Sequence, residues 1–93
     1  MVSKMLIHNE KDLVGVVTQD IIDGEEVEGV YMDTHNKIKL KAISPIPLGH
    51  KMALKDIKQN ELVIEYGEPI GKATANIKMG EHVHTNNLKT MRW

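Results

Sequence analysis

The clearest pattern along the chain is a strict alternation of polar and apolar residues at positions 37–42, Lys-Ile-Lys-Leu-Lys-Ala. A period of two places Ile38, Leu40 and Ala42 on one face of a strand and the three lysines on the other. Short apolar runs of strand length recur along the chain, whereas the spacing of an amphipathic helix is hard to find. Further strands are expected at residues 13–17, 27–32, 50–54, 62–66, 70–77 and 81–85.

Turn and breaker residues separate these runs. Asp23-Gly24, residues 67–69 and residues 79–81 have the composition of turns. Two prolines in residues 44–49 exclude a helix or a central strand there, because they remove backbone donors and restrict the backbone. Residues 55–60 are the one segment where a short helical turn fits. No internal repeat or flexible linker is visible.

The pattern therefore predicts an all-β fold of short, strongly bent strands with at most one short helical turn. A chain of 93 residues supports one domain and no more. We expect this domain to span residues 1–93, with an ordered core at about residues 6–88 and a C-terminal tail at residues 89–93.

Composition narrows the class of protein. The chain contains no phenylalanine and no cysteine, so the core must be aliphatic, and disulfides, iron–sulfur ligation and thiol catalysis are excluded. Its 12 basic and 13 acidic residues give no electrostatic reason to expect nucleic acid or a membrane as partner. No apolar run approaches the ~20 residues of a membrane span, and the first residues do not resemble a signal peptide. These features favour a cytoplasmic protein.

The charges are unevenly distributed. Residues 20–33 contain six carboxylates and no basic residue, whereas residues 37–58 contain six lysines and one acid, Asp56. One interpretation is a pair of oppositely charged, solvated strand faces that lie near each other. The other is that the lysines face an anionic substrate or an acidic partner surface.

The histidines are the side chains in this sequence that are best suited to acid–base chemistry or ligand binding. His82 and His84 are two residues apart, so on a strand both side chains project from the same face. His50, which follows Gly49, is a candidate third member. Such imidazoles can bind a metal ion, hold an anion or act as acid and base near neutral pH. They can equally be solvated or bonded to a loop, and His8 and His35 are interpreted as structural or inert.

A complete metal site is not expected from this chain alone. It has no cysteine and no His-x-x-x-His spacing, and Glu81 is expected to point to the face opposite His82. Lys51 and Lys72 are suited to hold a carboxylate or a sulfonate, or are ordinary surface charges. Composition and spacing thus lead to a small β domain with a two- or three-histidine face and do not name a reaction.

Residues 49–57, Gly-His-Lys-Met-Ala-Leu-Lys-Asp-Ile, resemble part of the amino-terminal domain of altronate and galactarate dehydratases. The resemblance continues through residues 63–73 and residues 80–88, and residues 12–21 fit the start of the same domain less distinctively. That domain is of the SAF type, which implies a small β-clip fold. Residues 88–93 are similar to the end of the small subunits of (2R)-sulfolactate sulfo-lyases.

The resemblance implies the small subunit of a two-component lyase that acts on a 2-hydroxy acid and is inactive alone. The leaving group is water in a dehydratase and sulfite in a sulfo-lyase. The implied partner is a large catalytic subunit that holds a divalent metal ion, with iron expected, whereas this chain is expected to bind no cofactor. Exposed strand edges and Trp93 also make a homo-oligomer an expected possibility.

The resemblance also implies roles for single residues. The implied catalytic residues are His50, His82 and His84, and the implied substrate-binding residues are Lys51, Lys72, Asn86 and Asn87. The family commonly reads His-Val-His-Thr-His-Asn at this point, whereas this chain has Asn86 where a further histidine is usual. Asparagine keeps hydrogen-bonding capacity but cannot carry a proton and is a poor ligand for a transition metal. We therefore assign to Asn86 no role that would require a histidine side chain.

Two other functions stay open at this stage. One is a non-catalytic SAF-type module that binds a small molecule or a protein, since one fold serves several functions. The other is a degenerate, regulatory small subunit, which the change at Asn86 keeps in consideration. The histidines near the end of the chain favour the lyase, because a binding module would not need them.

Overall fold

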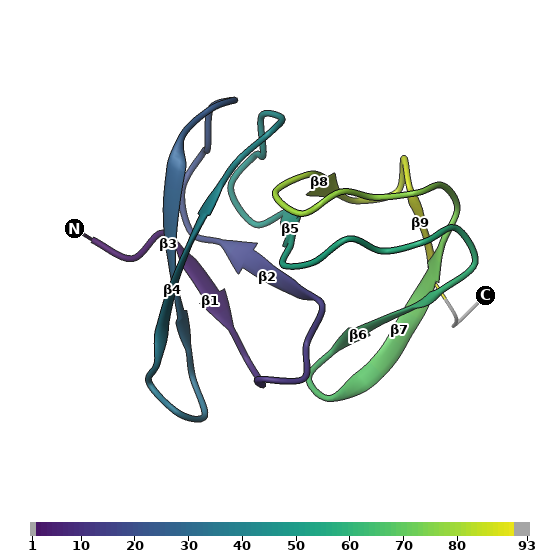
Figure 1. Ribbon diagram of the computed structural model, residues 1–93, viewed down its shortest axis with the longest axis horizontal. Helices are drawn as coiled ribbons and strands as arrows, with labels where there is room; N and C mark the ends of the chain where they lie inside the picture. The colour runs from purple at the N-terminus through teal and green to yellow at the C-terminus, as the bar shows by residue number, and fades with distance from the viewer. Residues whose placement is uncertain (1, 91–93) are drawn as a thin grey trace.

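The computed structural model describes residues 2–90, and within this range the fold is all-β, as predicted (Figure 1). The strands are β1 (Met5–Ile7), β2 (Val14–Val17), β3 (Glu26–Tyr31), β4 (Lys37–Lys41), β5 (Lys51–Ala53), β6 (Leu62–Glu65), β7 (Glu68–Ala73), β8 (His82–Val83) and β9 (Leu88–Thr90). Residues 2–90 contain no helix that is long and apolar enough to cross a membrane.

The strands form two curled sheets. One has six strands in the order β4-β3-β1-β2-β5-β8, and the other has three in the order β6-β7-β9. Only the pairing of β1 with β3 is parallel among the pairs of named strands in residues 2–90. Figure 1 shows β5 and β8 in the middle of the molecule, between β1–β4 on one side and β6, β7 and β9 on the other.

Each side of the molecule has its own aliphatic core, as the absence of phenylalanine requires. The core beside β1–β4 consists of Met5, Ile7, Val17, Ile21, Val27, Ala42, Ile46, Met52 and Leu54. The core beside β6, β7 and β9 consists of Val14, Ala53, Ile57, Val63, Ala73, Ile77, Val83 and Leu88. Because β2 and β5 contribute residues to both cores, they join the two halves.

A turn that occurs four times in residues 2–90 organises both halves. In each copy a buried isoleucine is followed three residues later by a residue with φ between 72° and 88°. The four copies, here called isoleucine turns, are Ile21–Gly24, Ile46–Gly49, Ile57–Asn60 and Ile77–Gly80. In every copy the N–H of the next residue donates to the carbonyl two residues before the positive-φ residue, which is the hydrogen bond of a type II turn.

A pair of backbone hydrogen bonds anchors each isoleucine turn to a distant strand or its end. The N–H of the positive-φ residue donates to the carbonyl of an anchor residue. The N–H of that anchor residue donates in turn to the carbonyl of the residue after the turn, and all eight distances are 2.8–3.0 Å. The four anchor residues are buried, at 1% exposure or less: Ala42, Val17, Ala73 and Ala53. The isoleucines also bridge in pairs, Ile21 with Ile46 and Ile57 with Ile77. The chain therefore does contain an internal repeat, contrary to the sequence interpretation.

Several predicted elements differ from the observed ones. Residues 55–60 are not helical, because the third isoleucine turn requires a left-handed backbone at Asn60. Strand β1 was missed because its three residues are too few to show a period. The expected strand at 70–77 instead starts at Glu68 and ends at Ala73, where the anchor bonds begin.

The expected C-terminal tail is also partly wrong, since residues 88–90 form β9 and pair with β7. The expected strand at 81–85 is limited to β8, because the chain turns at residues 84–87. Trp93, on which the expectation of self-association partly rests, lies outside the described residues.

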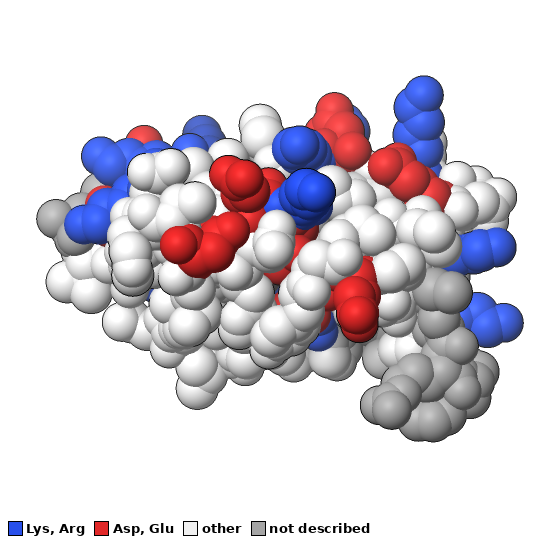
Figure 2. All heavy atoms as spheres, turned by 90° about the horizontal axis from the view of Figure 1, so that it is seen from below, with Lys and Arg blue, Asp and Glu red and all other residues white. Residues whose placement is uncertain are grey.

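Part of the uneven charge distribution consists of cross-strand partners on β3 and β4. The alternation at residues 37–42 is confirmed as β4, which pairs with β3 so that Glu26 lies opposite Lys41 and Glu28 opposite Lys39. Figure 2 shows acidic and basic side chains beside one another on one face of the molecule. This arrangement supports the interpretation as neighbouring, solvated charged faces for the β4 lysines.

The isoleucine turns generate a stability prediction. Gly24 and Gly80 have nearly the same φ, 87° and 88°, but an added methyl group at Gly24 meets nothing within 4 Å, whereas at Gly80 it collides with the carbonyl oxygen of Lys41. Gly24→Ala is expected to cost about 1–2 kcal/mol of unfolding free energy for the backbone conformation alone. Gly80→Ala is expected to cost about 1–3 kcal/mol more for the collision.

Urea denaturation of the two variants measures the difference. Equal losses of unfolding free energy in both variants would contradict the role assigned to the contact between Gly80 and Lys41.

Candidate active site

Three histidines gather where β5 and β8 pair. His50 directly precedes β5, His82 begins β8 and His84 follows β8. The antiparallel register pairs Lys51 with Val83 and Met52 with His82. Extending this register by one residue brings His50 opposite His84. Because side chains alternate between the two faces of a strand, His82 projects from the same face of the sheet as His84. The strand pairing thus assembles the three imidazoles that the sequence singled out.

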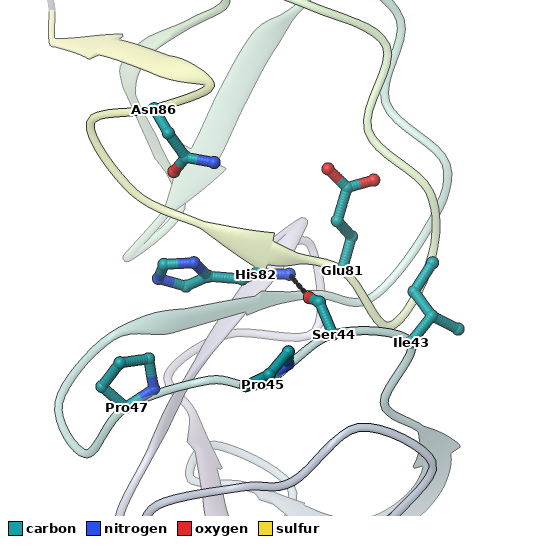
Figure 3. Close-up of a pocket in the computed structure, with 7 residues that line it drawn as sticks. All are labelled: Ile43, Ser44, Pro45, Pro47, Glu81, His82 and Asn86. Carbon is teal, nitrogen blue, oxygen red and sulfur yellow. Dashed lines mark hydrogen bonds between the residues drawn. The ribbon is translucent and has the colours of Figure 1, made fainter.

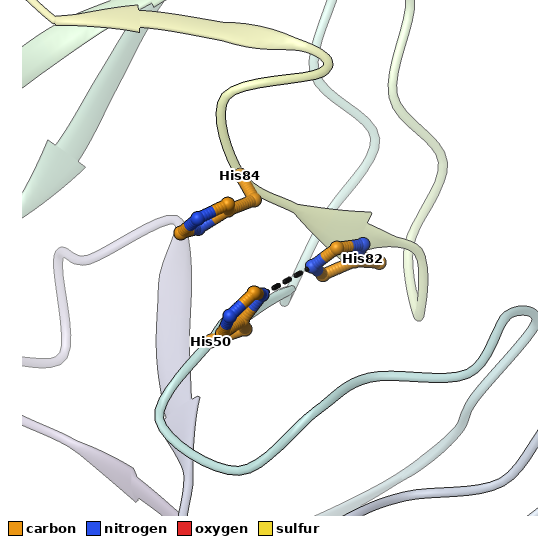
Figure 4. A group of neighbouring side chains, drawn as sticks. All are labelled: His50, His82 and His84. Atoms are coloured by element: carbon orange, nitrogen blue, oxygen red, sulfur yellow. Dashed lines mark hydrogen bonds between the residues drawn. The ribbon is translucent and has the colours of Figure 1, made fainter.

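The three rings are in direct contact (Figure 4). Nδ1 of His50 and Nε2 of His82 are 2.8 Å apart, so one nitrogen donates a hydrogen bond and the other accepts it. The rings of His50 and His84 stack with their centroids 3.9 Å apart and their planes at 17°. One nitrogen from each of the three histidines lies within 4.8 Å of the others. Among residues 2–90 this is the only group of three or more potential metal-binding side chains.

The second isoleucine turn explains why position 50 can be a histidine. In the other three copies a glutamate holds this position, and its carboxylate accepts a hydrogen bond from the N–H three residues earlier, at 2.9–3.1 Å. In the second copy that earlier residue is Pro47, which has no N–H to satisfy. His50 is therefore free of the capping role and projects toward β8.

The main chain under His82 and His84 is held by two polar side chains. The N–H of His82 donates to Oγ of Ser44 at 2.9 Å, and the N–H of His84 donates to Oδ1 of Asn87 at 3.0 Å. The amide nitrogen of Asn87 donates to the carbonyl of His82 at 2.8 Å and to Glu81 at 3.3 Å. Asn87 is buried, with 4% exposure, and its side-chain amide holds the backbone of His82 and His84 in place.

The environment lowers the basicity of two of the imidazoles. Burial, reinforced by the neighbouring His50 and His84, lowers the pKa of His82 below its usual value of 6.5, although Glu81 acts in the opposite direction. Burial also lowers the pKa of His84, with further contributions from His50 and Lys51. Both rings are therefore neutral at pH 7 and keep an unprotonated nitrogen available.

His82 forms part of the wall of a pocket of about 500 Å³ (Figure 3). The pocket is lined by Ile43, Ser44, Pro45, Pro47, Glu81, His82 and Asn86. The prolines that excluded regular structure at residues 44–49 thus form the apolar side of this pocket. Asn86 is among the residues that line this pocket, and its contact to a ligand stays a prediction.

The structure separates the two lysines that the sequence considered together. Lys51 is half-buried at the start of β5, near enough to His84 to lower its pKa. It also lines a second pocket with Glu65, where burial raises the pKa of Glu65 and the charge of Lys51 partly offsets that increase. Lys72 lies exposed on β7, opposite Leu62 and Lys89, and outside both of these pockets.

Sequence reasoning found the histidines but missed two of the residues that support them. Ser44 and Glu81 contact the His82 segment from a crossing loop and from a turn. The spacing of the isoleucine turns was the available signal for Glu81, because it marks that residue as a turn cap. No sequence signal identified Ser44, since its contact depends on how residues 44–49 cross β8.

Comparisons with known proteins agree with this fold. The family model described as the altronate/galactarate dehydratase SAF domain matches residues 3–91. The (2R)-sulfolactate sulfo-lyase subunit alpha of Chromohalobacter salexigens is 38% identical over 89 residues, which is 95% of this chain and 95% of that protein. The subunit of the same name from Paracoccus pantotrophus is 45% identical over 64 residues, covering 69% of this chain and 96% of that protein.

A longer relative matches through one part of its length. The altronate dehydratase of Bacillus subtilis is 39% identical over 92 residues, which is 97% of this chain but 17% of that enzyme. The similarity therefore extends to larger enzymes in which a segment like this chain is a small portion of the whole.

The lowered pKa values generate a prediction for stability as a function of pH. As the pH falls through 6.5 toward the folded-state pKa values, His82 and His84 bind protons in the unfolded chain before they do so in the folded one. The free energy of unfolding is therefore expected to decrease between about pH 7.5 and 5.5. Urea denaturation across this range measures the slope.

The double variant His82→Asn/His84→Asn isolates this contribution from other titrating groups. Its unfolding free energy is expected to depend less on pH than that of the unmodified chain. An unchanged slope would show that these two imidazoles do not resist protonation in the folded state.

Proposed function

This chain belongs to the altronate/galactarate dehydratase SAF domain family, and from that premise we propose that it is the small subunit of a two-component lyase acting on a 2-hydroxy acid. The match to almost the whole length of two sulfo-lyase alpha subunits supports a subunit of that kind. The name "subunit alpha" in these relatives implies a partner subunit, which we take to be the large catalytic one.

The observation that carries this proposal is the assembly of His50, His82 and His84 on one face at the edge of a pocket. The rings are half-buried, and the protein itself holds the backbone of His82 and His84 through Ser44 and Asn87. Positioned groups with displaced pKa values next to a cavity are characteristic of functional sites. We propose that these imidazoles complete an active site whose other part lies on the large subunit.

The reaction class sets the chemical requirements for this site. A proton leaves the carbon next to the carboxylate, a group departs from the neighbouring carbon, and the resulting enol becomes a 2-keto acid. The departing group is water from a sugar acid or sulfite from sulfolactate. The reaction needs a base near neutrality and a cation or hydrogen-bond donors for the developing enolate. Unprotonated imidazole nitrogens can meet the first need or hold a cation for the second.

The neighbouring polar residues suit an anionic substrate. Lys51 lies close to His84, where its charge would attract a carboxylate or a sulfonate. Asn86 lies at the rim of the pocket beside His82 and offers an amide donor. Lys51 lines the second pocket rather than that of His82, whereas Lys72 lines neither pocket and is not among the charges that act on His84, so it is less suited to the same substrate. A divalent metal ion, iron by the family expectation, would supply further stabilisation of the enolate when bound.

Co-expression with a candidate large subunit tests the proposed function. Keto acid should form from sulfolactate, altronate or galactarate only when both chains are present, and the active substrate identifies the leaving group. Two folded chains that neither co-purify nor produce keto acid from any of these substrates would overturn the proposal.

A substitution then tests the assignment of the site. In the active two-subunit enzyme, His84→Ala is expected to lower kcat by about 10²–10⁴-fold, the usual contribution of a positioned acid–base group. His35→Asn is the control, because His35 is exposed, lies outside the histidine cluster and has a φ of 64° that asparagine tolerates. Near-normal kcat in His84→Ala with intact subunit association would remove His84 from the active site.

A further inference from the structure

The three imidazoles have nitrogen atoms that the protein itself does not use. Among residues 2–90 the only hydrogen bond of these rings is the one between His50 and His82. No backbone carbonyl or carboxylate in this range accepts a hydrogen bond from any of the three rings. None of these nitrogens is a buried atom without a partner, so the unused ones are open to solvent and accessible to an external ligand.

The spacing of these nitrogens suits one metal ion. Two imidazole nitrogens bound to the same ion at about 2.0–2.1 Å lie roughly 3.3 Å apart in a tetrahedral site. The observed separations are 2.8 Å for His50 and His82 and at most 4.8 Å within the group. The three rings are nearly parallel, with interplanar angles of 12–21°, and the lone pair of an imidazole nitrogen lies in its ring plane. Binding of one ion therefore requires rotation about the bond between Cβ and the ring, which has a broad energy profile.

We propose that His50, His82 and His84 together bind one divalent transition-metal ion. Imidazole nitrogen favours ions such as Zn²⁺, Fe²⁺, Co²⁺ and Ni²⁺ over Mg²⁺ and Ca²⁺, which prefer oxygen ligands. Glu81 is not a fourth ligand, because its carboxylate caps the N–H of Lys78 at 3.0 Å and accepts from Asn87 at 3.3 Å. Three protein ligands leave a position open, which is the arrangement of catalytic rather than structural sites.

Within the proposed lyase, a bound metal ion would give the histidine cluster a more specific role. Metal binding itself does not depend on the proposed function, whereas its use in catalysis rests on that function. Because His82 also lines the pocket, a substrate oxygen or a group of the large subunit that enters this pocket could complete the coordination. The sequence argument against a metal site required a full ligand set from this chain, and a site that is completed at a subunit interface does not need one.

Metal binding by the tag-free chain tests the inference without the partner subunit. After treatment with a chelator, the chain is titrated with Zn²⁺ by calorimetry and with Co²⁺ by visible absorption. One equivalent of each ion is expected to bind, and Mg²⁺ is expected not to bind. His84→Asn and His50→Asn are each expected to weaken binding by at least about tenfold, which is the smallest usual effect even for residues that only support a ligand.

His35→Asn is the matched control, because His35 is exposed and its φ of 64° is tolerated by asparagine. Circular dichroism establishes that each variant is folded. The absence of saturable binding, or equal affinity in the control and both cluster variants, would overturn the inference. If the chain bound no metal while the two-subunit enzyme stayed active, the metal site would be wrong and the proposed function would stand.

Discussion

The structure depends on one backbone constraint, the left-handed residue that closes each isoleucine turn. Glycine adopts this conformation without steric cost, and asparagine tolerates it, which accounts for the residue types at positions 24, 49, 60 and 80. The turn exposes its own N–H and carbonyl groups in the orientation of a strand, so each turn can pair with a buried anchor residue far along the chain. Four such pairings let the helix-free segment 2–90 bend its short strands around two small cores whose buried residues are all aliphatic.

The turn next to the candidate site keeps this left-handed residue, Gly49, but differs from the other three turns in its cap. Three of the turns use a glutamate to satisfy their first N–H, whereas the second turn has Pro47 in that place and needs no cap. The same proline lines the pocket next to His82. One residue therefore both removes the structural demand on position 50 and shapes the surface beside the histidines. The candidate site thus lies at the copy of the turn, among the four in residues 2–90, in which no glutamate cap is needed.

The electrostatics of the site favour neutral rings. Burial and mutual proximity lower the pKa values of His82 and His84, and the nearby Lys51 acts in the same direction on His84. Neutral imidazoles that are held close together serve as acceptors of a proton or as ligands of a cation, and both abilities suit the formation of an enolate. The rest of the pocket lining is mixed, with Ile43, Pro45 and Pro47 as apolar residues and Ser44, Glu81 and Asn86 as polar ones.

The sequence by itself determined the all-β class, the aliphatic core, the β4 alternation and the three histidines, because these follow from residue type and from the period of two. It did not determine β1, β9 or the isoleucine turns, since very short strands carry too little periodicity and the anchor bonds join residues distant in sequence. The position of His50 against His82 and His84 was likewise decided by the pairing of β5 with β8. Only the tertiary structure could show this, because the spacing within one strand relates His82 to His84 but says nothing about a residue 32 positions away.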